Sequence, residues 1–173
     1  KSIVKYDATV GGGIPTQRVI NSCLFGEQID RVFGIVNATS NFIYSKMMVN
    51  NTSFMDALLD AQKMGYAEND PSEDILGNDA LYKLSILILM YMNKIVDVKK
   101  MQAIPIVDTN LDDMIYAEEL GYSIKPIIYG ELCDDIIKYA VGPSLIKKEN
   151  IIFITIIQNY RCFNFINMKI FLL

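Results

Sequence analysis

The residues with the most chemical potential lie in one segment, residues 65–87, which reads GYAENDPSEDILGNDALYKLSIL. Its acidic residues come first and a single lysine follows them: Glu68, Asp70, Glu73, Asp74, Asp79 and then Lys83. On a helix, the spacing of four between Asp79 and Lys83 places a carboxylate and an ammonium on one face, one turn apart. Such a pair can hold a lysine for proton transfer, but most such pairs are solvated surface pairs that contribute well under ~1 kcal/mol. Spacing alone therefore favours the surface-pair interpretation and assigns no role to the segment.

Composition excludes several kinds of site. The chain has no histidine, which excludes a serine–histidine triad and a histidine-ligated metal and leaves proton transfer to Asp, Glu, Lys, Tyr or Cys. The net charge of -4, with scattered basic residues, argues against nucleic-acid binding. The wide spacing of Cys23, Cys133 and Cys162 favours free thiols in a reducing compartment over disulfides or a zinc site.

The elements that must position these residues show both strand and helix patterns. Strand patterns occupy residues 3–10, 29–36, 123–129 and 136–141. Helix patterns run from Pro15 to a stop at Gly26 and over residues 37–48, 52–64, 78–92 and 111–120, with a polar loop at 66–76. Tight hairpin signals are few. We therefore predict an α+β fold with a mixed β-sheet covered by helices.

The chain divides into a domain and a tail. Residues 1–150 are expected to form one domain, because no linker divides them. Residues 151–173 are an atypical apolar tail, in which Gln158 and Arg161 interrupt the run that a membrane helix needs. A strand with a poorly specified end, or sequence read past the true coding region, is favoured instead. The chain begins at Lys1, inside a strand pattern and without a signal-peptide pattern, which indicates a truncated, cytoplasmic protein.

Four separated stretches resemble the homoserine dehydrogenase family, in the family's own order. They are YDATVGGGIP at residues 6–15, GIVNATSNFIYSKM at 34–47, the segment at 65–87, and AEELGYSIKPI at 117–127. VGPSLI at 141–146 extends the match, and the resemblance ends near Asn150. It implies an oxidoreductase that interconverts L-homoserine and L-aspartate 4-semialdehyde with NAD or NADP, in threonine and methionine biosynthesis. It also implies the catalytic part of a homodimer formed through the sheet.

The resemblance also assigns roles within the site. Lys83 would transfer the proton of the substrate hydroxyl, and Asp79 would orient Lys83 and contact homoserine. The other expected substrate residues are Glu68, for the substrate's ammonium group, Asp74, Tyr66 and Thr39, and the expected cofactor residue is Gly65. A Na⁺ site would use the backbone carbonyls of Val10, Gly12 and Ile14 and the carboxylate of Asp7.

Four positions depart from the family's pattern. Asp7 stands where the family usually has Glu, Ala38 replaces a usual glycine, and Leu81-Tyr82 replaces Ala-Arg before the lysine. No strand–GxGxxG–helix motif occurs either, so we expect the cofactor's nucleotide to be bound mostly by a domain absent here and the isolated chain to show negligible turnover. The alternative hypothesis is a non-catalytic remnant that only associates with itself or with a partner. A module attached to membranes through the tail is the least favoured.

Overall fold

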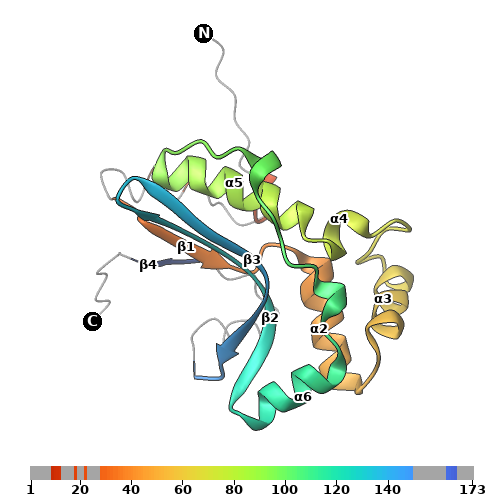
Figure 1. Cartoon of the computed structure of the whole chain (residues 1–173). Coiled ribbons are helices and arrows are strands. Elements are labelled where there is room, and N and C mark those ends of the chain that lie inside the picture. Colours follow the sequence, from red (N-terminus) through yellow and green to blue (C-terminus); the bar gives the residue numbers. More distant parts are fainter. Residues whose placement is uncertain (1–8, 13–17, 19–21, 23–27, 150–162, 167–173) are drawn as a thin grey trace.

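The computed structural model describes residues 9–12, 18, 22, 28–149 and 163–166. Its sheet has the strand order β3-β2-β1-β4, and the helices α2, α3 and α6 gather beside it, at the right in Figure 1. The strands are β1 (Arg31–Gly34), β2 (Tyr122–Cys133), β3 (Ile136–Lys147) and β4 (Phe163–Ile166). The predicted α+β class is confirmed. All pairings between the described strands are antiparallel, so the mixed character predicted for the sheet is not found among them.

The two longest strands form a hairpin that the sequence did not signal. β2 and β3 pair from Tyr122↔Lys147 to Cys133↔Ile136, and both are longer than the strands predicted at 123–129 and 136–141. The two residues between them, Asp134 and Asp135, have φ angles of 48° and 68°. In a type I′ two-residue hairpin loop both positions have positive φ, which Asn-Gly or Asp-Gly supplies most readily. Asp-Asp is a weak form of that signal, so this hairpin was not predicted from the sequence.

The main helices begin and end at residues that local chemistry dictates. They are α2 (Ala38–Asn50), α3 (Phe54–Lys63), α5 (Asn78–Met92) and α6 (Leu111–Glu119), each close to its predicted range. The side chain of Ser53 accepts a hydrogen bond from the backbone N–H of Asp56 and so caps α3. Asn110 and Asp113 form a reciprocal capping box at the start of α6.

Short helices lie outside the helical ranges predicted from the sequence. The polar stretch 66–76 contains α4 (Ser72–Ile75), and 3-10 turns lie at η2 (Val98–Lys100) and η3 (Ile106–Asp108). One turn of helix has no apolar periodicity, so patterning cannot reveal it. Helix α4 is important for the site because it carries Asp74, a predicted site residue.

The two larger apolar clusters among the described residues hold the layers together. The first packs α5 on the sheet, with Leu84 and Ile88 fully buried near Val32 of β1 and Ile128 of β2. The second lies among α2, α3 and α6 and is built from side chains including Ile43, Tyr44, Met47, Ala57 and Met114. Truncating such a fully buried aliphatic side chain to alanine costs about 2–5 kcal/mol. The clusters therefore fix α5 against β1 and α2 against α3 and α6.

Some of the predictions concern residues that the structure does not describe. Of the strand predicted at 3–10, only Thr9 and Val10 are described, and they lie in turns rather than a strand. Arg18 and Ser22 are helical, as predicted, whereas Asp7, Ile14, Cys23 and Cys162 lie outside the described residues. Cys133 is a free, partly buried thiol. Within the described parts, no helix is long and apolar enough to cross a membrane.

Candidate active site

Helix α5 brings together the two residues that were predicted to share its face. Lys83 Nζ lies 2.5 Å from Asp79 Oδ2, and the exposed fractions of the two side chains are 23% and 30%. The same ammonium donates to the carbonyl oxygen of Val36, just beyond β1, at 3.3 Å. The pair is therefore tied to the end of a central strand and is not a fully solvated surface pair. An ammonium has three donors, so one remains for an incoming oxygen.

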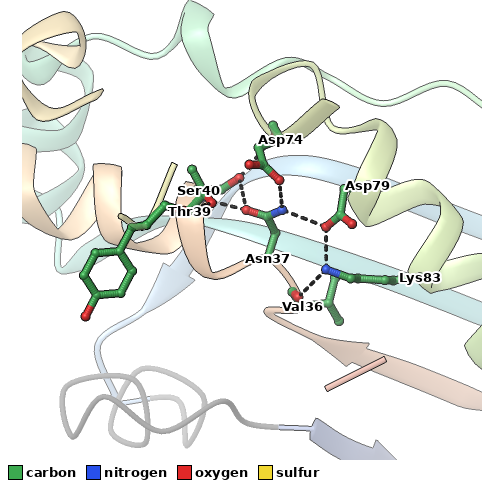
Figure 2. Close-up of polar contacts among 8 residues, drawn as sticks. Val36, Asn37, Thr39, Ser40, Asp74, Asp79 and Lys83 are labelled. Atoms are coloured by element: carbon green, nitrogen blue, oxygen red, sulfur yellow. Dashed lines mark hydrogen bonds and ion pairs between the residues drawn. The ribbon is translucent and has the colours of Figure 1, made fainter. Parts of the chain in front are cut away.

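A third residue, Asn37, joins this pair to a second carboxylate. Its side-chain nitrogen donates to Asp79 Oδ2 at 2.7 Å and to Asp74 Oδ1 at 2.6 Å, as Figure 2 shows. Its side-chain oxygen accepts from the backbone N–H and the hydroxyl of Ser40, both at 2.8 Å, which caps α2. Asn37 was not among the site residues predicted from the sequence. The available signal was its place as an N-cap residue immediately before α2.

Asp74 reaches this network because α4 and the start of α5 are fixed locally. Asp70 accepts from the backbone N–H and the hydroxyl of Ser72, and the hydroxyl bond above all lowers the pKa of Asp70. Gly77, between α4 and α5, has φ 84°, and an added Cβ would lie 2.7 Å from Ala103 Cβ. This left-handed, crowded position suits glycine alone and sets the angle at which α5 leaves α4.

The other predicted substrate residues lie beside the network rather than in it. Thr39 donates its hydroxyl proton to the carbonyl oxygen of Tyr66 at 2.6 Å, and the Tyr66 ring stacks on Phe42 with centroids 4.4 Å apart. This anchors the loop after α3 to the first turn of α2. Glu68 is exposed, and among the described residues its carboxylate has no hydrogen-bond partner. Gly65 is exposed at φ 75°, with no atom within 4 Å of the position of an added Cβ.

The network carries two carboxylates and one ammonium, so its formal charge is negative. One side of it borders a small cavity of about 10 Å³, room for roughly one water molecule. The residues around that cavity include Asn37 and Asp74 from the network, with Ile104, Ile127 and Gly142 opposite. The arrangement can bind a cationic group and present an ammonium proton to a nearby oxygen.

The predicted cation site and the family departures can be placed in part. Val10 is buried and Gly12 is exposed in a turn where Gly11 and Gly12 have φ of 87° and 61°. In the parts of the chain that the structure describes, no group of three or more acidic or cysteine side chains is placed to hold a metal. Ala38 opens α2 and is partly buried. Tyr82 is 52% exposed on α5, away from the buried face that Leu81 joins.

Comparison with known proteins then places the chain. The profile of the homoserine dehydrogenase family matches residues 15–167, which is most of the sequence. The chain belongs to this family. The match continues past Asn150, where the resemblance was expected to end, and it includes β4, which pairs with β1 in the sheet.

Homoserine dehydrogenases with curated sequences and solved structures resemble this chain over most of its length. That of Helicobacter pylori is 40% identical over 146 residues, covering 84% of this chain and 35% of the relative. That of Neisseria gonorrhoeae is 37% identical and covers 87% and 34%. The crystal structure from Thiobacillus denitrificans superposes with a TM-score of 0.82 at 37% identity, covering 87% of this chain and 35% of that one. The chain thus spans about a third of the length of these homoserine dehydrogenases.

Proposed function

We propose that this chain forms the substrate-binding and proton-transfer part of an enzyme that interconverts L-homoserine and L-aspartate 4-semialdehyde. The observation that carries the proposal is the continuous set of bonds from Lys83 through Asp79 and Asn37 to Asp74. A partly exposed ammonium held by a carboxylate is what an alcohol–aldehyde interconversion needs, because the substrate oxygen must lose or gain a proton. Membership of the homoserine dehydrogenase family supports this assignment.

Each residue has a definite task in the proposed reaction. In the direction of reduction, the Lys83 ammonium donates a proton to the aldehyde oxygen, and Asp79 holds the ammonium in place. The second oxygen of Asp79 remains available to the substrate, since Oδ2 receives both Lys83 and Asn37. Glu68 and Asp74 supply negative charge for the substrate's ammonium group. Thr39 and Tyr66, joined by the hydrogen bond from the Thr39 hydroxyl to the Tyr66 carbonyl oxygen, would line the substrate site.

The nicotinamide cofactor supplies or accepts the hydride when it is bound. The described residue expected beside it, Gly65, presents open backbone with no neighbour at its Cβ position, which fits a surface that a ligand can approach closely. A monovalent cation at Asp7, Val10, Gly12 and Ile14 is a separate proposal, in which Val10, Gly12 and Ile14 would contribute carbonyl oxygens and Asp7 its carboxylate. Thermal unfolding in NaCl against choline chloride tests it, and equal midpoints would contradict it.

A homodimer formed through the sheet is also proposed. An added Cβ on Gly130 would lie 3.2 Å from Leu84 and 3.3 Å from Ile88, so Gly130 faces α5 and its neighbours Tyr129 and Glu131 face the other side. On that side Arg31 pairs with Glu131, and Tyr129 lies opposite Phe33 in the register. Sedimentation equilibrium tests the dimer. A monomer for both the wild type and Tyr129→Lys would contradict it.

The proposed function is tested by titrating L-homoserine into the chain and measuring heat or amide chemical shifts. We expect saturable binding that weakens about tenfold or more in Glu68→Gln and in Lys83→Met, since each loses a charged hydrogen bond. Tyr82→Phe is the matched control, because this exposed side chain lies next to Lys83 in sequence. Self-association without any response to homoserine would favour the non-catalytic remnant instead.

Turnover is a second measurement on the same samples. We expect negligible homoserine-dependent reduction of NAD or NADP by the 173-residue chain alone, because it contains no glycine-rich nucleotide-binding motif of the usual form. Clear reduction that disappears in Lys83→Met would contradict that expectation and would place the cofactor site on this chain.

A further inference from the structure

Asn37 occupies a position that neither the proposed proton transfer nor the expected substrate contacts explain. Its amide is buried, with 6% of the residue exposed, yet it contacts three groups of the site. The orientation of the amide is unambiguous. The backbone N–H of Ser40 can only donate, so the atom that it contacts must be the Asn37 oxygen, and the nitrogen must face the two carboxylates.

We propose that Asn37 is a positioning residue, whose amide bridges the Asp74 and Asp79 carboxylates and thereby sets the Asp79–Lys83 pair; this rests on the proposed function. Two carboxylates whose oxygens lie within 2.7 Å of one nitrogen are close like charges. The amide satisfies one oxygen of each with its two donors. Asp79 Oδ2 is the oxygen that also receives Lys83, so the bond from Asn37 fixes which oxygen faces the ammonium and which faces a ligand.

The bridge links segments that are far apart in the chain. Asn37 is the N-cap of α2, Asp74 belongs to α4, and Asp79 lies in the first turn of α5, so one amide holds the starts of three elements together (Figure 2). The cap itself holds the amide in place. A change at Asn37 that keeps the cap therefore separates the bridging role from helix stability.

Asn37→Ser is the variant that makes this separation. Serine caps helices as well as asparagine does, but its hydroxyl is too short to reach both carboxylates. Asn37→Asp, with the same shape, also keeps the cap and replaces both donor bonds with repulsion, so it provides a second variant if the first unfolds. Ser40→Ala is the matched control, because it removes the hydroxyl contacts to the same amide and to the backbone carbonyl oxygen of Asp74 and leaves both carboxylate bonds of Asn37 in place.

Two readouts decide the proposal independently. In the ligand-free chain, we expect an observable ¹H–¹⁵N signal from the Lys83 ammonium in the wild type and in Ser40→Ala. In both Asn37 variants this signal should be lost, just as the exposed ammonium of Lys63 should give no signal. L-homoserine affinity is expected to fall on the order of tenfold or more in the Asn37 variants and less than about twofold in Ser40→Ala. A Lys83 signal unchanged in both folded Asn37 variants would overturn the positioning role. If the wild type does not bind homoserine, the proposed function fails, and the ammonium signal still decides the role of Asn37.

Discussion

The ammonium of Lys83 and the carboxylate of Asp79 lie 2.5 Å apart on successive turns of α5, and each side chain is less than one-third exposed. The ammonium also reaches the carbonyl of Val36 beyond β1, so the pair fastens the start of α5 to the end of a central strand. A pair in this position differs from the exposed pairs of the same chain, such as Lys100 with Asp97, where the lysine is 84% exposed.

Replacing Asp79 with alanine should destabilise the fold. The change leaves a partly buried ammonium and the Asn37 amide without their shared acceptor, and the expected loss is about 1–3 kcal/mol in the free energy of unfolding. Lys100→Gln, at the exposed pair, should change that free energy by less than about 0.5 kcal/mol. Denaturant unfolding measures both. Equal effects would mean that the Asp79–Lys83 pair is an ordinary surface pair.

The buried hydroxyl of Tyr44 should make stability depend on pH in the alkaline range. Burial raises the pKa of Tyr44 to about 12 from an ordinary value of 10, although the hydrogen bond with Thr109 acts against the shift. Because the folded pKa lies above the unfolded one, this contribution to stability is fully present below pH 10 and is lost as pH rises through 12. Tyr44→Phe should cost about 1–2 kcal/mol at neutral pH.

The test compares unfolding midpoints between pH 8 and pH 12. The gap between wild type and Tyr44→Phe should close as the pH rises, whereas Tyr116→Phe should run parallel to wild type because Tyr116 is 62% exposed. A constant gap up to pH 12 would count against this role of Tyr44.

Local periodicity accounts for the parts of the fold that the sequence predicts well. The range 78–92 predicted for α5 agrees with the structure at both ends, and the spacing of Asp79 and Lys83 within it placed them on one face. Both features depend only on neighbouring residues along the chain. The caps of α3 and α6 are local in the same sense.

The link from Asn37 to Asp74 could not be predicted in this way. It joins residues separated by 37 positions and depends on α4, a single turn without an apolar pattern. Glu68 is the converse case. The family pattern assigns it to the substrate, but its carboxylate makes no hydrogen bond to the Lys83–Asp79–Asn37–Asp74 network in the described residues. Only a bound ligand can therefore connect Glu68 to that network.

A substitution in the β2–β3 turn is expected to stabilise the fold, unlike the substitutions above. Asp135 has φ 68°, a conformation that costs glycine less than aspartate, and its carboxylate pairs with Lys94 at an exposed site. Asp135→Gly produces the Asp-Gly sequence favoured in such turns and should raise the free energy of unfolding by about 0.5–1 kcal/mol. Asp135→Ala, which loses the same ion pair but keeps a Cβ, is the control and should not stabilise. A fall in stability for Asp135→Gly would show that the ion pair outweighs the strain.

At Gly142, a single added methyl group should disturb the candidate active site through the neighbouring Ile104 segment. It has φ 142°, and an added Cβ would lie 2.7 Å from the carbonyl oxygen of Ile104 and 2.8 Å from its Cβ. Ile104 is held there by its own N–H, which donates to Val141 at 2.8 Å, so the segment cannot yield without losing that bond. Gly142→Ala should therefore cost about 2–4 kcal/mol from strain and overlap together.

Gly121→Ala separates the two causes. Gly121 has φ 81° but no atom within 4 Å of the added Cβ, so its loss should be only about 1–2 kcal/mol, from backbone strain alone. Unfolding free energies of both variants measure the difference. Since Ile104 and Gly142 line the cavity beside Asn37 and Asp74, Gly142→Ala should also weaken homoserine binding, whereas Gly121→Ala should not. Equal losses of stability with unchanged binding in both would show that the Ile104 segment gives way freely and does not support the site.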